Sequence, residues 1–528
     1  MGNSASDDAP TIPKRMYYLF VGNIVSTLIL AITAIFVGRL LGPGRYGLYT
    51  LALVMPGYVS SIALLGLPFA ATRFPAKYSA EGDREHAVSF IQSLTIAGGV
   101  VGIVGSVALI PFSGYLAVRL LDRPVLAFLM PIALMSVFGQ LLYQIATSGF
   151  QGLNRMERSA QMQVFQAVVK LLVSLFLIIA GFGVAGAVVG YTTAFLASGL
   201  VSAAYVFYLN RKMILRSNFS SDMKEAVRYS TPVFLSNLLA GVVPAYLVTL
   251  LAKFSTNAQI GGYGASQNLV ALISLFIYPI STVLFPHFSG LSADGEGLRN
   301  AYQTSVKYST IFIVPVAVVM MSLSTIIASA IYGRAYSFAG DFLLILMISY
   351  LFAGIGSLAQ VSFLNGIGET RKTLAVGALG SGITFFLGAL LAPVLSVYGV
   401  LAASVAGNVA SYLLAARMVA RIIGSTKLPA RSLLVYPASA IAAAFAYTVR
   451  YIPTHPIIQL LIGASVFFAL LMPILALFGA VNDAEIQDVR GFFKEMGFVS
   501  RLLEAVLFYY ILFKRRNSES KNSPFKYT

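Results

Sequence analysis

Long apolar windows without charge follow one another along almost the whole chain, and they constrain the fold more than any other feature. A helix that crosses the hydrocarbon core of a bilayer needs about 20 mostly apolar residues. Windows of this kind recur from residue 16 to residue 480 of the 528-residue chain, and only 10% of its residues are charged. A soluble domain carries roughly 25% charged residues. The sequence therefore predicts an all-α polytopic membrane protein.

We expect about fourteen transmembrane helices, from the number of windows long enough to span. Two helical hairpins are predicted from turn residues alone, at Gly181-Phe182-Gly183 and between Pro393 and Gly399. The expected helices cover residues 16–38, 46–71, 87–112, 125–150, 160–181, 185–208, 229–252, 263–285, 306–332, 342–365, 373–393, 397–416, 432–449 and 457–480.

The distribution of basic residues tests this count. The chain has a formal net charge of +17, and Lys and Arg in membrane proteins gather in cytoplasmic loops. With a cytoplasmic N-terminus, the predicted cytoplasmic segments before the C-terminal tail hold 20 Lys and Arg, and the predicted external loops hold 7. An error of one helix would scramble this asymmetry. The charges therefore predict an even number of helices and two cytoplasmic termini. The expected location is the cytoplasmic membrane.

Three short motifs of the first half recur in the second half, at offsets of 217, 211 and 214 residues. Offsets this close indicate two six-helix bundles. Because six is even, both bundles enter the membrane from the same side, which makes a parallel repeat with a pseudo-two-fold axis along the membrane normal. The paired motifs are Tyr46-Gly47 with Tyr263-Gly264, Phe74-Pro75 with Phe285-Pro286, and residues 151–159 with residues 365–373.

The repeat divides the chain into segments with expected boundaries. A cytoplasmic tail precedes the first bundle, a basic cytoplasmic linker joins the bundles, and two further helices follow them. The C-terminal tail contains an apolar run too short to span, which predicts an interfacial helix near anionic lipid headgroups. The segments are residues 1–15 (tail), 16–208 (first bundle), 209–228 (linker), 229–423 (second bundle), 432–480 (helices 13 and 14) and 481–528 (C-terminal tail).

Three loop motifs resemble those of the polysaccharide-biosynthesis flippases, which belong to the multidrug/oligosaccharidyl-lipid/polysaccharide exporter superfamily and include O-antigen and lipid II flippases. The motifs are LGPGRYGLY (41–49), GLPFAATRFPAKYSAEGD (66–83) and NGIGETRK (365–372). The resemblance implies two bundles that rock around a central cavity. In that cavity the sugar and diphosphate headgroup of a polyprenyl-linked oligosaccharide would travel, while the polyprenyl tail stays in lipid.

Lys170 is the most informative single residue. At 1.5 Å per residue it lies ~15 Å into the predicted fifth helix, near the bilayer midplane. A charge at that depth costs about 2.5–3.5 kcal/mol, so we expect an interaction of the lysine to offset that cost. Gln163 and Gln166 share its helix face, together with Ser174.

A second polar stripe on the predicted fourth helix, at four-residue steps, includes Gln140 and Gln144. The two helices are consecutive and antiparallel, so their stripes can meet. They form either a wet cavity wall, where Lys170 attracts a phosphate or sugar acid, or interhelical contacts through hydrogen-bonded amides.

Three further residues are candidates for substrate binding. Asn23 and Asn268 lie on polar stripes of the predicted first and eighth helices, which line the cavity if the resemblance holds. Small-residue packing is the alternative for both. Arg73 falls in the second loop motif, where it can meet a diphosphate at the cytoplasmic mouth or serve as a plain positive-inside anchor.

The missing residue types exclude several functions. The chain has no cysteine, and its three histidines are scattered, so we expect no metal site and no cofactor. No Asp or Glu lies within the core of a predicted helix. Proton and sodium sites in membranes usually use a buried carboxylate, so a drug exporter of the same superfamily, the second hypothesis, is disfavoured. A membrane glycosyltransferase is a third, disfavoured because external loops carry few acids for a metal or base. The first hypothesis is a lipid-linked oligosaccharide flippase. Its expected partners are anionic lipids and the glycosyltransferases or polymerase of the same pathway, and we expect no nucleic acid to bind.

Overall fold

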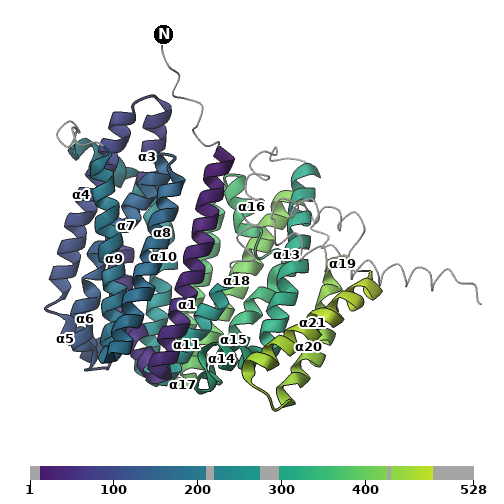
Figure 1. Cartoon of the computed structure of the whole chain (residues 1–528). Helices are drawn as coiled ribbons and strands as arrows, with labels where there is room; N and C mark the ends of the chain where they lie inside the picture. The colour runs from purple at the N-terminus through teal and green to yellow at the C-terminus, as the bar shows by residue number, and fades with distance from the viewer. Residues whose placement is uncertain (1–11, 210–218, 274–295, 425–429, 480–528) are drawn as a thin grey trace, which may run out of the picture. The chain divides into compact units, whose positions relative to one another are not determined.

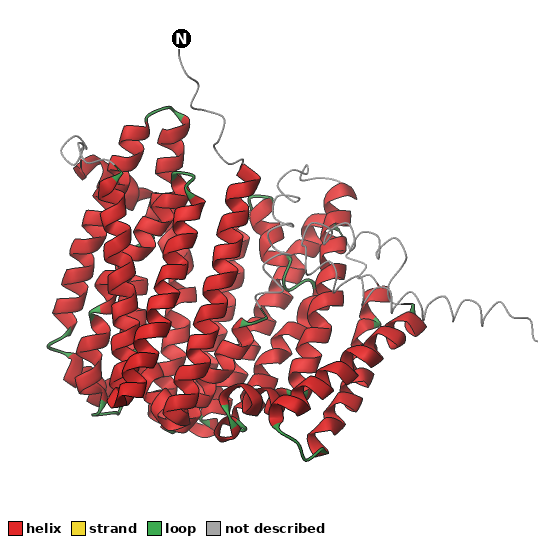
Figure 2. Ribbon diagram, viewed as in Figure 1, coloured by secondary structure: helices red, strands yellow, loops and turns green. Residues whose placement is uncertain are grey.

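The computed structural model describes residues 12–209, 219–273, 296–424 and 430–479. Every regular element in these ranges is a helix (Figure 2). The physical reason is that backbone in hydrocarbon must satisfy its own hydrogen bonds, which an α-helix does within one segment. The all-α prediction is therefore confirmed.

In the described ranges, eight helical segments are long and apolar enough to cross a membrane, or nine if one bent pair forms a single span. The protein is a multi-pass membrane protein. The predicted number of fourteen is not confirmed by this count, which treats the 53 residues Met156–Tyr208 as one segment although they contain a hairpin. Outside the described residues lie most of the predicted N-terminal tail, part of the linker (210–218), the end of the predicted eighth helix (274–285) and the C-terminal tail with its interfacial helix.

Two compact units make up the chain. The first comprises residues 1–268 together with 385–400, and the second comprises residues 269–384 together with 401–528. The hairpin between the predicted eleventh and twelfth helices thus belongs with the first unit. The two six-helix bundles inferred from the repeat stay a prediction.

In the first unit, the loop motif after the first predicted helix contains a break between two helical stretches. α1 (Ile12–Ala52) consists of these two stretches, which meet at Gly42, whose φ of 71° and ψ of 166° are not helical, followed directly by Pro43. A single helix over 46–71 was expected next, and this expectation is wrong. The backbone turns at Leu65 (φ 46°) and Gly66 (φ 73°), so α2 and α3 are separate helices.

The remaining helices of the first unit follow the expected order (Figure 1). The predicted hairpin at residues 181–183 is confirmed, because Gly181 (φ 95°) and Gly183 (φ 54°) adopt left-handed conformations that favour glycine. The helices are α2 (Val54–Ala63), α3 (Leu67–Ala80), α4 (Arg84–Leu109), α5 (Ser113–Tyr115), η1 (Leu116–Leu120), α6 (Leu126–Leu134), α7 (Ser136–Gly152), α8 (Met156–Leu177), η2 (Ile178–Phe182), α9 (Gly183–Tyr208), α10 (Phe219–Phe254) and α11 (Asn257–Ala271).

Small residues bring these helices close together, as is common where lipid supplies no hydrophobic drive between helices. α8 packs against both α1 and α9, and α9 also packs against α7. A Cβ atom on Gly22 of α1 would lie 2.4 Å from Cβ of Ala160 on α8. A Cβ on Gly139 of α7 would lie 2.5 Å from the backbone of Phe195 on α9. α9 is therefore wedged between α7 and α8.

The second unit contains most of the remaining helices. The predicted hairpin between Pro393 and Gly399 is confirmed, since the chain reverses at Ser396 with φ 54°. The helices from residue 296 onward are α13 (Glu296–Ser322), α14 (Ser324–Tyr332), η3 (Arg334–Tyr336), α15 (Ala339–Met347), η4 (Ile348–Ile355), α16 (Gln360–Gly366), α17 (Thr370–Leu395), α18 (Val397–Ile423), α19 (Ala430–Leu433), α20 (Val435–Tyr447), η5 (Thr448–Tyr451) and α21 (Pro456–Phe478).

One predicted span of this unit, residues 342–365, is a broken helix. The segment that ends in η4 and the short α16 meet at 51°, with Gly356 in the left-handed conformation (φ 87°) between them. Tyr436 of α20 fills the break: its hydroxyl donates to the carbonyl of Leu351 and accepts from the backbone N–H of Gly354 at 3.1 Å. A neighbouring helix thus makes two hydrogen bonds to the backbone of η4, just before the break.

Candidate functional site

Lys170 lies on α8 as predicted, half-buried within the apolar segment Met156–Tyr208. Its Nζ atom lies 5.2 Å from the ring centroid of Tyr191 on α9, on which it makes a cation–π contact. Among the described residues, no carboxylate lies within 4.0 Å of this ammonium group. The lysine is therefore a cation in a membrane-spanning segment with an aromatic ring, and no acid, beside it.

Gln140 comes to the same ring from α7. Its side chain is buried, and Nε2 donates to Ser136 Oγ at 2.9 Å and to the Tyr191 hydroxyl at 3.4 Å. The two polar stripes were predicted to be able to meet. One residue of each, Gln140 of α7 and Lys170 of α8, contacts Tyr191 of α9, a helix that packs against both α7 and α8.

Tyr191 is the residue of this cluster that sequence reasoning missed. It stands in an apolar window, where a tyrosine has the same appearance as a packed core aromatic. The structure holds its ring edge-on against Phe195, with 5.0 Å between the centroids, while the hydroxyl faces Gln140. The available sequence signal was a polar stripe on each of two other helices, α7 and α8. It suggested a contact between those two helices and gave no indication of α9.

The other residues of the two polar stripes are buried or half-buried. On α8, Gln166 is buried and Gln163 is half-buried. Ser174 is fully buried where α8 meets α9, and a Cβ on Gly190 would lie 2.2 Å from its Oγ. Gln144 of α7 is half-buried. Ser174 is therefore part of a close helix contact, as the packing alternative requires.

Asn23 lies half-buried on α1, the helix that packs against α8 on the side away from α7. Its backbone carbonyl accepts a hydrogen bond from Ser26 Oγ at 3.0 Å. Thr33 likewise donates to the carbonyl of Ile29 at 2.7 Å. Hydroxyl groups of this stripe are thus satisfied within their own helix, and only Asn23 stays a candidate for contact with a substrate.

Asn268 of α11 is fixed to the first half of the chain. Its Nδ2 donates to the Tyr46 hydroxyl at 2.9 Å and to the carbonyl of Gly264 at 2.9 Å. Tyr46 in turn stacks on Tyr49 with 5.8 Å between ring centroids. Tyr46 and Gly264 belong to the pair of motifs that repeat at an offset of 217 residues, so the two copies of the repeat contact each other here.

The backbones at this contact are as close as glycine allows. A Cβ atom on Gly47 would lie 1.9 Å from the carbonyl oxygen of Asn257, and one on Gly261 would lie 2.0 Å from the carbonyl oxygen of Pro43. The bent end of α1 and the start of α11 therefore pack with no side chain between them.

Arg73 does not join the cluster around Lys170. It is exposed on α3, where its guanidinium carbon lies 4.3 Å from the ring centroid of Tyr229 on α10 and 6.0 Å from that of Phe74. A cation held by aromatic rings and open to solvent can still meet an anionic headgroup, so its role at the mouth stays a prediction.

Arg123 was not predicted as functional, yet it ties together three chain segments that are far apart in sequence. Its Nε donates to Asn257 Oδ1 at 2.7 Å and its Nη2 to the carbonyl of Ser255 at 2.9 Å. The hydroxyls of Ser255 and Ser396 lie 2.9 Å apart. All these residues fall in loops predicted to be external, so the arginine clamps that end of the first unit.

Replacing Arg123 by alanine is expected to loosen this clamp, because Asn257 and the Ser255 carbonyl lose a charged donor. Hydrogen bonds to charged groups contribute about 1.5–3 kcal/mol, so amide exchange at residues 253–258 should accelerate about tenfold or more. The exposed Arg119 of η1 offers the matched control, since Arg119→Ala removes the same charge nearby and should leave exchange unchanged. Equal exchange in both variants would contradict the clamp.

The described residues contain no group of three or more His, Asp and Glu side chains that could hold a metal ion. The chemistry on offer is that of one cation, several amides and several phenols. Such groups are suited to binding anions and hydroxyl groups.

Sequence comparison decides the family. Residues 13–292 match the family described as polysaccharide biosynthesis protein. The chain belongs to this family. The match covers α1 to α11, the part of the chain that contains Lys170, Tyr191 and the contact between the two repeat motifs.

Characterised and uncharacterised relatives from other organisms match the chain at low sequence identity. Stage V sporulation protein B of Bacillus subtilis is 25% identical over 451 residues, which cover 78% of this chain and 84% of that protein. The probable flippase AglR of Haloferax volcanii is 22% identical over 411 residues, covering 76% and 82%. The uncharacterized membrane protein MJ1068 of Methanocaldococcus jannaschii is 24% identical over 284 residues, and this match spans only 54% of that protein.

Solved structures share the fold. The lipid II flippase MurJ in an inward closed conformation matches with a TM-score of 0.70 at 16% identity, covering 85% of this chain and 97% of that one. An inward-facing multidrug resistance transporter of the MATE family, in the MOP superfamily, matches with a TM-score of 0.61 at 18% identity, covering 75% and 94%. This member of the polysaccharide biosynthesis family therefore has the fold of MOP-superfamily flippases and transporters, as the resemblance implied.

Proposed function

We propose that this polysaccharide biosynthesis protein is a flippase that moves a polyprenyl-(di)phosphate-linked oligosaccharide across the cytoplasmic membrane by alternating access. The cargo would serve assembly of a cell-surface polysaccharide or a glycoprotein glycan. Both termini would lie in the cytoplasm, and anionic lipids and the glycosyltransferases or polymerase of the same pathway would be its partners.

One observation carries this proposal: Lys170 is a cation within a spanning segment that faces an aromatic ring and, among the residues the structure describes, no carboxylate. A charge in that position is costly unless an opposite charge offsets the cost for part of the time. A phosphate that passes through would supply it, and amide and phenol groups such as Gln140 and Tyr191 are suited to the hydroxyl groups of a sugar. The relatives add support, since AglR is named a probable flippase and MurJ a lipid II flippase.

The second candidate is a drug or small-molecule exporter, favoured by the structural likeness to MATE transporters. Proton and sodium sites in membrane transporters usually contain a buried carboxylate. In the described part of the chain the one buried acidic side chain is Asp222, which lies in the first turn of α10 and within the predicted cytoplasmic linker. The location of that carboxylate away from Lys170 disfavours an exporter of cationic drugs.

A transport assay separates the two functions. We expect purified protein in proteoliposomes to accelerate transbilayer movement of a fluorescent polyprenyl-diphosphate oligosaccharide at least about tenfold over empty liposomes, because the barrier for the headgroup is removed. The same vesicles, with a proton or sodium gradient, should not accumulate a cationic dye. Dye uptake without movement of the lipid-linked sugar would favour the exporter and overturn the proposal.

A further inference from the structure

The turn from α7 into α8 has the same local structure as its repeated copy between α16 and α17. The two copies are residues 151–159 and residues 365–373. Asn154 and Gly368 stand at the same position of the repeat, and both adopt the left-handed conformation, with φ of 56° and 82°. The side chains at the first and last positions also form a hydrogen bond in each copy, at 3.0 Å in the first and 2.8 Å in the second. The two copies are therefore equivalent scaffolds for the charges they carry.

The charges of the two copies are the same in number and differ in order. Each copy contains one acid and two bases, so each has a net charge of +1. In the second copy Glu369 Oε1 pairs with Lys372 Nζ at 2.9 Å. Arg155 and Arg158 hold the same two positions in the first copy, where Glu157 stands between them with a buried Oε2 atom. A positive-inside anchor needs only net charge, so it does not explain this exchange of an ion pair for two cations.

Both arginines contact the same aromatic ring. Arg155 Nη1 donates to the Tyr205 hydroxyl at 3.4 Å, and Arg158 Cζ lies 5.1 Å from the centroid of the Tyr205 ring. The second copy has Val419 at the equivalent position, 214 residues later. Of the two copies, the one with two arginines is thus the one that has a phenol ring to hold guanidinium groups.

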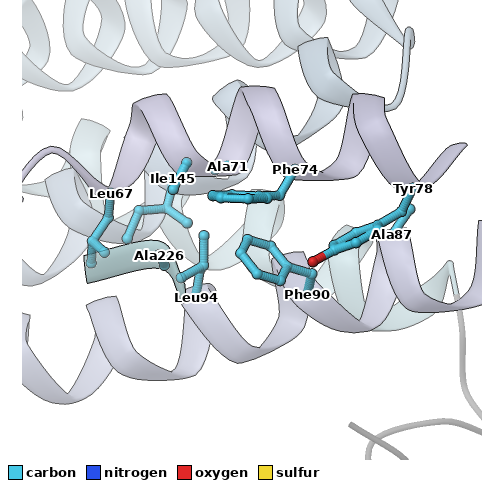
Figure 3. Packing of buried hydrophobic residues seen from close by; sticks show 10 residues of the cluster. Leu67, Ala71, Phe74, Tyr78, Ala87, Phe90, Leu94, Ile145 and Ala226 are labelled. Carbon is cyan, nitrogen blue, oxygen red and sulfur yellow. The ribbon is translucent and has the colours of Figure 1, made fainter. Parts of the chain in front are cut away.

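Apolar packing fixes the position of this ring. Ile145 of α7 is buried in a cluster with Phe74 of α3 and Phe90 of α4 (Figure 3). Further along α7, Phe150 belongs to a second buried cluster, and the Tyr205 ring packs edge-on against it with 5.4 Å between the centroids. Tyr205 is therefore a rigid support for both arginines at the end of α9.

Among the side chains that the structure describes, no carboxylate oxygen lies within 4.0 Å of either guanidinium group. A guanidinium group has five N–H donors. Besides the contacts with Tyr205, Arg158 Nη1 donates to Gln161 Oε1 at 2.9 Å. Arg155 is exposed and Arg158 is half-buried. In this part of the chain, several donors on two neighbouring cations therefore face no anion of the protein.

We propose that Arg155, Arg158 and Tyr205 bind the phosphate group of an anionic phospholipid. Tyr208, exposed and stacked on Tyr205 with 6.4 Å between ring centroids, ends α9, and tyrosines at the ends of spanning helices are typical of the headgroup level. Guanidinium groups form paired hydrogen bonds with phosphate oxygens. The single negative charge of a phosphodiester matches the one carboxylate that Glu369 supplies in the second copy. The site does not depend on the identity of the cargo.

Quenching of a single tryptophan by brominated lipid tests this site on the full chain, which has no tryptophan of its own. Tyr208→Trp places the reporter beside Tyr205 and keeps an aromatic ring at the end of α9. In vesicles of phosphatidylglycerol and phosphatidylcholine, brominated phosphatidylglycerol should occupy the position next to the reporter at least about fivefold in preference to brominated phosphatidylcholine. This factor corresponds to the contribution of one basic side chain near an anionic lipid surface.

Variants in the Tyr208→Trp background identify the groups responsible. Arg155→Glu gives the first copy the charge order of the second, so the new carboxylate should pair with Arg158 and the preference should fall to about one. The second copy shows that the turn accepts an acid at this position. Arg158→Gln removes one cation without adding an acid, so it should give an intermediate preference. Arg84→Gln is the matched control, since it removes an exposed arginine on the same predicted side and should leave the preference unchanged.

Two results would overturn the proposal directly: equal quenching by the two brominated lipids, or a preference that survives Arg155→Glu. Competition with unbrominated lipids separates the possible sources of the phosphate. Relief of quenching by phosphatidylglycerol supports the phospholipid site. Relief by polyprenyl diphosphate, with none from phosphatidylglycerol at equal charge, would assign the arginines to the cargo and overturn the phospholipid site.

Discussion

Lys170→Met is expected to slow transbilayer movement of a polyprenyl-diphosphate oligosaccharide by about 10- to 100-fold. The substitution keeps the length of the side chain and removes its charge. A hydrogen bond to a charged group contributes about 1.5–3 kcal/mol, and each 1.4 kcal/mol corresponds to a factor of ten. The measurement is the proteoliposome assay described above, with equal amounts of reconstituted wild type and variant.

Folding and transport must be separated in this experiment. Burying a lysine in a bilayer costs about 2.5–3.5 kcal/mol, so removal of its charge should leave thermal stability unchanged or raise it. Lys253→Met is the matched control, because Lys253 is exposed in the last turn of α10 and should tolerate the change. If Lys170→Met transports at the wild-type rate, the lysine is an interhelical contact and the phosphate is bound elsewhere.

Gly47→Ala is expected to destabilise the protein by about 3 kcal/mol, at the upper end of the usual cost of overpacking. The added methyl group would overlap the Asn257 carbonyl oxygen, 1.9 Å away, and backbone cannot move aside as a flexible side chain can. The bent end of α1 must then separate from α11. Thermal unfolding of the purified protein should show a midpoint lowered by several degrees.

Gly44 gives the control three residues earlier in the same helix. A Cβ atom there would have no heavy atom within 4 Å, so Gly44→Ala should be neutral or slightly stabilising, because alanine is a better helix former than glycine. Both glycines stand in the motif at residues 41–49. Equal stability of the two variants would show that the α1–α11 contact is not as close as described.

Much of the fold could be predicted from the sequence, since the bilayer imposes length and polarity on each span. The two hairpins were predicted from Gly181-Phe182-Gly183 and from the turn residues between Pro393 and Gly399, which interrupt otherwise apolar runs. The break at Leu65 and Gly66 was missed, because neither residue interrupts the hydropathy that marks a span. The early start of α10 at Phe219 was missed for the opposite reason: its first turns are polar and have the composition of a loop.

A residue of the candidate site could be predicted only where its polarity differs from that of the sequence around it. Lys170 stands out because its charge lies in an apolar window, and the structure brings it near Gln140 through Tyr191. Tyr191 could not be found this way, since its partners come from two other helices. Asp222 was assigned to a loop, and its burial depends on tertiary packing that no local pattern reports. Roles in binding stay predictions for all eight candidates.

The hydroxyl of Tyr436 connects α20, one of the two helices outside the predicted repeat, to η4, which lies within it. In hydrocarbon each backbone group without a partner costs several kcal/mol, and this tyrosine supplies partners for Leu351 and Gly354 at the break between η4 and α16. A chain shortened to the twelve helices of the predicted repeat would lose both of these hydrogen bonds as well as the packing of α20 on α13. The additional pair of helices thus stabilises a broken helix of the repeat that precedes it in the chain.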